Sequence, residues 1–188
     1  MFKGLKNRMR GDGRSEKKKS YDENGHTLAE GRVLVVSDSH GRNGNLLLVM
    51  DRVKPDLILH LGDSEDDEDL IMAEAQCPVI ILCGNCDYSR YLPDEEVVIL
   101  GSHRVFLAHG HRHNVRFDLE TLAEAALEQD CDVAIYGHTH MPEMEEEQGV
   151  TIYNPGSISL PRQAGHKPSF MVLDVDSEGE LHPAINYL

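Results

Sequence analysis

Three runs of apolar, largely β-branched residues constrain the fold of this chain most strongly. They occupy residues 32–38, 56–63 and 78–83, and two segments with helical spacing, 45–53 and 65–76, lie between them. Continuous apolar runs are typical of strands that are covered on both faces, as in parallel sheets. The resulting β-α-β-α-β order predicts a right-handed α/β unit with parallel strands.

The second half of the chain is richer in strands. Residues 96–100 and 104–108 flank Gly-Ser-His and predict a hairpin, and residues 117–129 predict an amphipathic helix. Further strands are expected over residues 132–136, 150–153, 169–175 and 180–185. The acidic segment 143–147 is interpreted as a solvated edge or turn. A length of 188 residues fits one domain of about 100–200 residues, with more than one sheet.

The first 31 residues differ in composition from the rest. They carry eight Lys or Arg against five acidic residues and show no hydrophobic periodicity. No apolar stretch follows the positive charges, so the segment is not a secretory signal. We therefore predict a basic, flexible leader over residues 1–31 and a folded domain over residues 32–188. A nucleic-acid-binding or partner-binding role for the leader is left open beside a purely solvated one.

Net charge limits the partners. The chain has 33 acidic and 18 basic residues, a formal net charge of −15. Without the leader, 28 acidic and ten basic residues leave −18. Such a surface would repel phosphate polymers and anionic lipids, and no apolar run approaches the roughly 20 residues of a membrane span. We expect neither a broad nucleic-acid surface nor a membrane partner.

The cysteines bear on compartment and redox chemistry. Four cysteines without an export signal indicate a reducing, cytoplasmic setting. Cys83 and Cys86 form a C-x-x-C pair, but redox pairs usually open a helix whose N-terminus lowers the thiol pKa. The segment after Cys86, which contains Pro93, is a poor helix start, so thiol redox chemistry is disfavoured.

Metal-capable residues gather where the predicted strands end. Five short segments with glycine carry them: Asp38-Ser39-His40-Gly41, Gly62-Asp63, Gly84-Asn85-Cys86-Asp87, His109-Gly110-His111 and Gly137-His138-Thr139-His140. In open α/β sheets, ligands bind at the carboxyl ends of the strands, and histidine is the commonest metal ligand. The segments therefore predict one shared metal site. An extended backbone would place Asp38 and His40 on one side of the chain, and likewise His138 and His140.

Together these segments resemble the signature of the calcineurin-like metallophosphoesterase superfamily: D-x-H, G-D, G-N-[HC]-[DE], a lone His and G-H-x-H, in this order. With Cys86 and the later Asn154-Pro155-Gly156-Ser157, residues 32–188 are most similar to its small, single-domain YfcE-type phosphodiesterases. The resemblance implies an α/β fold of two mixed β-sheets sandwiched between helices, a four-layer αββα arrangement.

The resemblance also implies a centre of two divalent metal ions. Asp38, His40 and His140 would hold one metal, Asn85, His109 and His138 the other, and Asp63 would bridge both. Oxygen and imidazole ligands without thiolate favour Mn²⁺, Fe, Co²⁺ or Zn²⁺ over soft-metal sites. We prefer Mn²⁺ and leave the others, with Ni, open.

The expected activity is hydrolysis of a small phosphodiester by a hydroxide that bridges the two metals. Two cations about 3.5–4 Å apart would neutralise the phosphate and align the bridging water for in-line attack. Catalytic roles are assigned to Asp63, to Asn85, whose amide could donate to a phosphoryl oxygen, and to Cys86. Many superfamily members have a histidine at the Cys86 position that protonates the leaving group, and a thiol of pKa about 8.5 is a weaker donor.

Other residues have less specific assignments. Arg42 and His111 are candidate substrate contacts, although a plain surface arginine and a histidine behind the pocket are equally compatible with the sequence. His60, within the second strand, is expected to be a hydrogen-bonded core residue. His113 is expected to lie behind the ligands or in solvent, and Ser157 to support the site structurally.

A second function stays open beside hydrolysis. The retromer subunit of this fold is a scaffold that binds protein partners without strong activity, so a catalytically weak or silent scaffold is the alternative. That subunit departs from the ligand pattern, whereas all seven positions are filled here. A homodimer through exposed strand edges is also left open.

Overall fold

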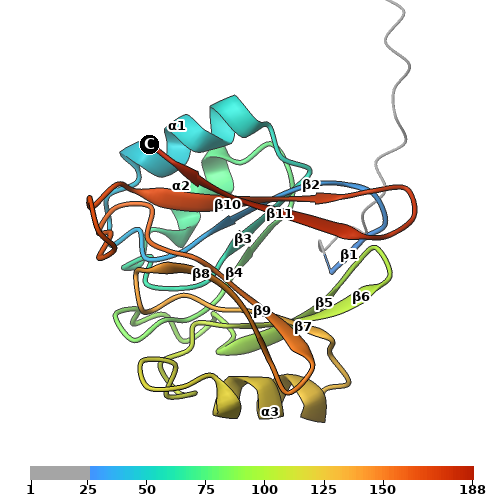
Figure 1. Cartoon of the computed structure of the whole chain (residues 1–188). Coiled ribbons are helices and arrows are strands. Elements are labelled where there is room, and N and C mark those ends of the chain that lie inside the picture. The colour runs from blue at the N-terminus through green and yellow to red at the C-terminus, as the bar shows by residue number, and fades with distance from the viewer. Residues whose placement is uncertain (1–25) are drawn as a thin grey trace, which may run out of the picture.

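The computed structural model describes residues 26–188 and arranges them in four layers, helix, sheet, sheet and helix (Figure 1). One sheet has five strands in the order β11-β10-β2-β3-β4, and the other has six in the order β1-β5-β6-β7-β9-β8. Both sheets mix parallel and antiparallel pairs. Helices α1 and α2 cover the five-stranded sheet, and α3 covers the six-stranded one. The α/β class with two mixed sheets between helices is thus confirmed.

The elements of the first half are β1 Thr27–Leu28, β2 Gly31–Val36, α1 Gly44–Val53, β3 Leu57–His60, α2 Glu68–Glu74, β4 Val79–Ile81 and β5 Glu95–Leu100. Those of the second half are β6 His103–Ala108, α3 Glu120–Glu128, β7 Val133–Ile135, β8 Pro142–Glu147, β9 Val150–Pro155, β10 Ser169–Val175 and β11 Leu181–Tyr187. The predicted β-α-β-α-β opening is confirmed, with β2, β3 and β4 parallel.

Two helices begin later than the sequence predicts. Helix α2 begins at Glu68 instead of residue 65, because Glu65 and Asp66 have φ angles of 57° and 64°, outside the helical region. Helix α3 begins at Glu120 instead of residue 117, because a run of turns connects it to β6. Both delays leave room for loops at the ends of β3 and β6.

The acidic segment 143–147 is an edge strand. It belongs to β8, which pairs antiparallel with β9 and has no second neighbouring strand among residues 26–188. Glu145 and Glu146 are exposed. Charged side chains on an outer strand discourage pairing with another chain, so the expected solvated edge is present as a strand.

The folded part begins before Arg32. Thr27 and Leu28 pair in parallel with Ile99 and Leu100 at the edge of the six-stranded sheet. Leu28 is fully buried in the core between the sheets. The sequence assigns these residues to the leader, but a short strand with one core side chain ties them to the domain. The remainder of the predicted leader, residues 1–25, lies outside the described residues.

The two sheets bring their carboxyl-end loops to one edge. An apolar cluster that includes Val35, Leu59 and Leu107 fills the space between the sheets, and separate clusters lie beneath the helices. The ends of β2 and β3 in one sheet and of β6 and β7 in the other are thereby fixed relative to each other. Among residues 26–188, no helix is long and apolar enough to cross a membrane.

Candidate metal centre

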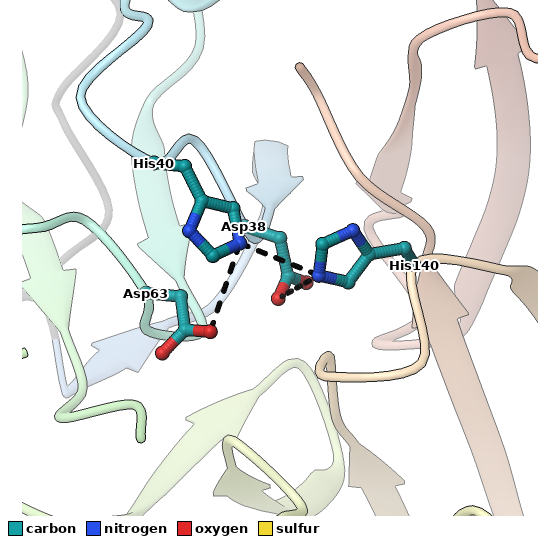
Figure 2. Close-up of side chains that lie close together, drawn as sticks. All are labelled: Asp38, His40, Asp63 and His140. Atoms are coloured by element: carbon teal, nitrogen blue, oxygen red, sulfur yellow. Dashed lines mark hydrogen bonds and ion pairs between the residues drawn. The ribbon is translucent and has the colours of Figure 1, made fainter. Parts of the chain in front are cut away.

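Four side chains from three strand ends meet at this edge. Asp38 and His40 follow β2, Asp63 follows β3 and His140 follows β7. One ligand-type atom from each residue lies within 4.8 Å of every other, and three of the four residues are buried. Figure 2 shows the rings of His40 and His140 facing each other beside the two carboxylates. The predicted shared site is therefore brought together for these four residues.

The two facing histidines present nitrogen lone pairs to each other. Nδ1 of His140 donates to the carbonyl oxygen of Leu160 at 2.6 Å, and Nδ1 of His40 lies 2.8 Å from Oε1 of Glu65. In the tautomer that donates from Nδ1 to these oxygens, the Nε2 atom of each ring has a free lone pair. These Nε2 atoms are 3.4 Å apart. Two facing lone pairs repel unless a positive charge lies between them.

Asp63 lies between this group and a second set of side chains. Its Oδ2 is 3.7 Å from Nε2 of His40 and 3.5 Å from Nε2 of His109. Its Oδ1 accepts a hydrogen bond of 2.8 Å from the backbone N–H of Cys86. Burial opposes ionisation, but His109 and the Cys86 N–H outweigh it and hold the pKa of Asp63 well below its usual range. The carboxylate is ionised and shared between two imidazoles.

The second set contains His109, Asn85 and His138. Nδ1 of His109 donates to the carbonyl oxygen of Leu61 at 2.7 Å, and its Nε2 lies 3.3 Å from Oδ1 of Asn85. The ring centroids of His109 and His138 are 5.1 Å apart. Burial, the charge of His109 and the nearby Arg116 lower the pKa of His138 to about 4, so its ring is neutral.

Asp38 is buried and incompletely satisfied. Its Oδ2 accepts a hydrogen bond of 3.1 Å from the backbone N–H of His138. Its Oδ1 accepts no hydrogen bond from the described residues and lies 3.1 Å from Nε2 of His140. Burial would raise the pKa of Asp38, but the neighbouring His140 and His109 outweigh it and lower the pKa. A buried anionic oxygen without a donor is a place for a cation.

The backbone at these positions is left-handed. The φ angles are 56° at Asp38, 47° at His40, 55° at Asp63, 65° at His138 and 60° at His140. Non-glycine residues adopt this region rarely, and such strain costs about 1–3 kcal/mol per residue and gathers at functional sites. The expected extended backbone is therefore wrong. As a result His140 joins the Asp38 group, whereas His138 lies beside His109.

Asp87 holds two of the loops in place. Its Oδ2 accepts hydrogen bonds from the backbone N–H groups of Asp63 and Gly84, at 2.8 and 2.7 Å. Its Oδ1 accepts from the N–H of Glu65 at 2.7 Å and from Oγ of Ser64 at 3.1 Å. Four donors on one carboxylate tie the Asp63 loop to the Asn85 loop. The sequence places Asp87 in a motif without a role, and its position next to the motif's asparagine and cysteine was the available signal.

Serines from the loop after β9 support the Asp38 loop. Oγ of the fully buried Ser157 donates to the carbonyl oxygen of Asp38 at 2.8 Å. Oγ of Ser159 lies 3.0 Å from the same oxygen and 2.7 Å from that of Ser39. Ser157 thus has the structural role expected for it, and Ser159 adds a contact that the sequence did not indicate.

One glycine is required where two loops touch. A Cβ atom on Gly84 would overlap Oδ1 and the backbone nitrogen of Asp63. Only a residue without a side chain lets the Asn85 loop approach Asp63 so closely.

The remaining candidate residues surround this centre. Asn85 is exposed, and its Nδ2 donates to Sγ of Cys86 at 3.2 Å. Burial and the charge of Asp63 raise the pKa of Cys86 to about 11, so the thiol keeps its proton. The ring of His111 lies 5.3 Å from that of His109 and 6.2 Å from that of His138. Arg42 is exposed, and no contact of its guanidinium with a ligand residue is present among residues 26–188.

Two further histidines are structural. His60 is fully buried, accepts from the N–H of Gly62 and lies 3.0 Å from Oγ of Ser39, which confirms the expected core residue. Burial lowers its pKa to about 4. His113 packs edge-on against Phe106 and lies 3.2 Å from Oε1 of Glu95, away from the ligand atoms.

The donor set fits divalent cations. It offers two ionised carboxylates, imidazole nitrogens whose Nδ1 hydrogens are held from behind, and an amide oxygen. Such outer hydrogen bonds orient metal-binding histidines. A four-layer α/β sandwich with this donor set at its strand ends agrees with the class that the sequence motifs resemble, the metal-dependent phosphoesterases.

Comparison with known proteins agrees with this class. The family described as the calcineurin-like phosphoesterase superfamily domain matches residues 32–178. The chain belongs to this family, as its sequence motifs indicate.

Named relatives and solved structures are consistent with the family. A probable metallophosphoesterase YsnB of Bacillus subtilis is 34% identical over 148 residues, which cover 78% of this chain and 85% of YsnB. The phosphodiesterase YfcE of Escherichia coli K12 is 38% identical over 106 residues, 52% of this chain and 53% of YfcE.

Two solved structures share the fold. A predicted phosphoesterase from Streptococcus pneumoniae superposes with a TM-score of 0.69 at 27% identity, covering 86% of this chain and 99% of its own. A single mutant of Vps29 from Entamoeba histolytica superposes with a TM-score of 0.67 at 26% identity, covering 84% and 99%.

Proposed function

We propose that this protein is a phosphodiesterase that hydrolyses a small phosphodiester at a centre of two divalent cations. The convergence of Nε2 atoms from three histidines on two ionised carboxylates carries the proposal. His40, His109 and His140 each have Nδ1 held by an oxygen atom. Their Nε2 atoms all lie within 3.7 Å of an oxygen of Asp38 or Asp63.

The proposed ligands divide into two sets. Asp38, His40 and His140 would hold one cation, Asn85, His109 and His138 the other, and Asp63 would contact both. The position of Asp63 Oδ2, 3.7 Å from Nε2 of His40 and 3.5 Å from Nε2 of His109, supports the bridging role. Mn²⁺ is our preferred metal because the proposed ligands are oxygen and imidazole atoms without thiolate. Fe, Co, Ni and Zn also accept this donor set.

Two divalent cations held by these residues would supply charge neutralisation of the phosphate and a lowered pKa for the water that attacks it. The carboxylate of Asp63 would fix the two sets of ligands relative to each other, since Oδ2 lies beside His40 and His109 and Oδ1 accepts from the Cys86 N–H. Asn85 would orient its amide by the contact of Nδ2 with Cys86 and present Oδ1 toward His109. Arg42 and His111 are proposed substrate contacts, His111 being supported by its place beside His109 and His138.

Cys86 governs the leaving group in this proposal. A thiol with a pKa of about 11 donates a proton less readily near neutral pH than an acid whose pKa lies near 7. We therefore expect diesters with good leaving groups, such as aryl esters, to react faster than alkyl diesters.

The test is a metal-dependent assay. Purified protein is dialysed against a chelator and assayed on an aryl phosphodiester, an aryl phosphomonoester and cyclic nucleotides, before and after addition of Mn²⁺. We expect turnover of the aryl diester to vanish with the chelator and to return with Mn²⁺. Full activity without metal would contradict the proposal.

The structural likeness to Vps29 favours one alternative, a weakly active or silent scaffold for protein partners. The filled ligand positions favour hydrolysis. Absence of turnover on the whole substrate panel, together with specific protein partners of the full chain, would support the scaffold.

The net charge and the free cysteines bear on the size of the substrate and on the cellular location. The net charge of −15 supports a small diester over a nucleic-acid polymer. The four free cysteines support our expectation of a cytoplasmic location. A homodimer would use exposed strand edges.

A further inference from the structure

Three aromatic side chains on the loops that carry proposed ligands are almost completely exposed. Tyr88 and Tyr91 are 87% and 96% exposed, and Phe117 is 88% exposed. They exceed every other exposed large apolar residue of the described chain, none of which is above 52%. Aromatic rings in water lose the burial that usually stabilises them, so three exposed rings on ligand-carrying loops favour a binding partner.

These side chains come from the two loops that carry proposed ligands. Tyr88 and Tyr91 follow Asn85 in the loop between β4 and β5, and Phe117 follows His109 in the loop between β6 and α3. The N–H of Tyr88 donates to Oδ1 of Asp66 at 3.1 Å, which holds this residue near the Asp63 loop. The backbone of Tyr88 is therefore tied to the loop that carries Asp63.

Ion pairs join the two loops to each other. Arg112 contacts Oδ2 of Asp94 at 2.5 Å, and Nε2 of His113 lies 3.2 Å from Oε1 of Glu95. Both pairs connect the segment after β6 with the start of β5. These pairs hold the two loops together, and we name their three exposed rings, Tyr88, Tyr91 and Phe117, the aromatic rim.

Arginines accompany the aromatic rim. Arg90 lies between the two tyrosines and Arg116 precedes Phe117; both are exposed, and neither has an ion pair with a residue in 26–188. The charge of Arg116 reaches His138. In a chain of net charge −15, two unpaired cations beside exposed rings favour a ligand that is both anionic and planar.

Resting on the proposed phosphodiesterase activity, we propose that the aromatic rim stacks against a planar ring in the substrate, making a nucleoside-bearing phosphodiester the preferred class. The cations of the metal centre and the two arginines would face the phosphate, and the rim would face the base. Stacking on aromatic side chains tolerates any base because every base has a π-face. The aromatic rim would thus select substrates that carry a planar base, whichever base that is.

The test compares two diesters with the same leaving group. Metal-loaded protein is assayed on thymidine 5′-(p-nitrophenyl phosphate) and on methyl p-nitrophenyl phosphate. We expect a higher kcat/KM for the thymidine diester, and Tyr88→Ala, Tyr91→Ala or Phe117→Ala to reduce the ratio of the two values about tenfold, within the range for loss of a stacked base. Tyr88→Phe and Tyr91→Phe keep the ring and should keep the ratio. Tyr187→Ala, on β11, is the control for removing an exposed tyrosine elsewhere.

A binding measurement separates this proposal from the proposed activity. Thymidine 5′-(methyl phosphate), which has a poor leaving group, is titrated into the protein and followed by tyrosine fluorescence, since the chain has no tryptophan. Binding that the alanine variants weaken, without turnover of either p-nitrophenyl diester, would support the rim and contradict the hydrolytic function. Turnover of both diesters with equal kcat/KM would overturn the rim and leave the activity intact. Unchanged selectivity, with an oligomer that dissociates in the alanine variants, would assign the rim to contacts between copies and also overturn the proposal.

Discussion

The rings of His40 and His140 direct their Nε2 atoms at one another across 3.4 Å. An oxygen atom lies within hydrogen-bond distance of each Nδ1, and donation from Nδ1 leaves each facing Nε2 with a lone pair that a cation can bind. Beside these nitrogens, Oδ1 of the buried Asp38 accepts no hydrogen bond from the described residues. The folded chain therefore presents two imidazole nitrogens and a carboxylate oxygen to a metal ion.

Binding of a metal at this point should raise the melting temperature of the protein. A ligand at 100 times its Kd stabilises the folded state by about 2.7 kcal/mol. We expect Mn²⁺ added to chelator-treated protein to raise Tm by several degrees, and His140→Gln to lose most of that rise. Thermal denaturation with and without Mn²⁺ measures the rise in Tm. His166→Gln, which replaces an exposed histidine, is the matched control. An equal rise in His140→Gln would contradict a metal at this position.

Asp87→Asn should weaken both the fold and the metal site. The carboxylate accepts four hydrogen bonds, two of them from the N–H groups of Asp63 and Glu65, and an amide nitrogen would face donors instead of accepting from them. We expect a loss of about 1.5–3 kcal/mol in the free energy of unfolding, typical of hydrogen bonds to a charged group. Metal affinity should fall about 10- to 100-fold, as for other partners that orient ligands.

Urea denaturation of metal-free protein and titration with Mn²⁺ measure the two effects of Asp87→Asn. Asp94→Asn, which breaks the surface pair with Arg112, is the control and should cost less than about 1 kcal/mol. Equal losses in the two variants would show that Asp87 is no more than another surface carboxylate.

Much of the site follows from the sequence because its chemistry is local. Asp38, Asp63 and His109 each come directly after an apolar run, and the ends of parallel strands must meet at one edge. The left-handed backbone at His138 and His140 could not be predicted, because ordinary residues adopt it only where surrounding contacts enforce it. Those contacts come from distant parts of the chain.

The misplaced boundaries of the fold have similar causes. Leu28 is one apolar residue in a basic, polar segment, and its burial depends on pairing with β5. The strand β8 is rich in glutamate, a residue depleted in strands, and exists because β9 offers it a partner. The local sequence pattern around Leu28 or β8 does not indicate that β5 or β9 will pair with it.

Acid should destabilise the metal-free protein partly through His60. Burial lowers the pKa of His60 from 6.5 to about 4, so between these pH values the unfolded chain binds a proton that the folded chain does not. Stability that is present above pH 6.5 is therefore lost as the pH falls toward 4. At about 1.4 kcal/mol per pKa unit, the loss is at most about 3.5 kcal/mol.

The His60→Gln variant tests this linkage. It should be less stable than the parent chain at pH 7.5 because it alters a buried, hydrogen-bonded position, yet it should lose less stability between pH 6.5 and pH 4.5. Urea denaturation across this pH range gives both quantities, with His166→Gln as the control. The same pH slope in His60→Gln and the parent chain would show that protonation of another group dominates.

Cys86→His should extend the activity to poor leaving groups. The Cys86 thiol has a pKa of about 11, whereas an imidazole is a proton donor suited to neutral pH, and a positioned general acid contributes about 10²- to 10⁴-fold. We expect hydrolysis of an alkyl phosphodiester to rise about tenfold or more, and hydrolysis of a p-nitrophenyl diester, whose leaving group needs no proton, to change much less. Cys86→Ser has a similar size without a better acid and should show no such gain. Steady-state rates on the two diesters give the comparison, and an unchanged alkyl rate in Cys86→His would mean that leaving-group protonation does not pass through this position.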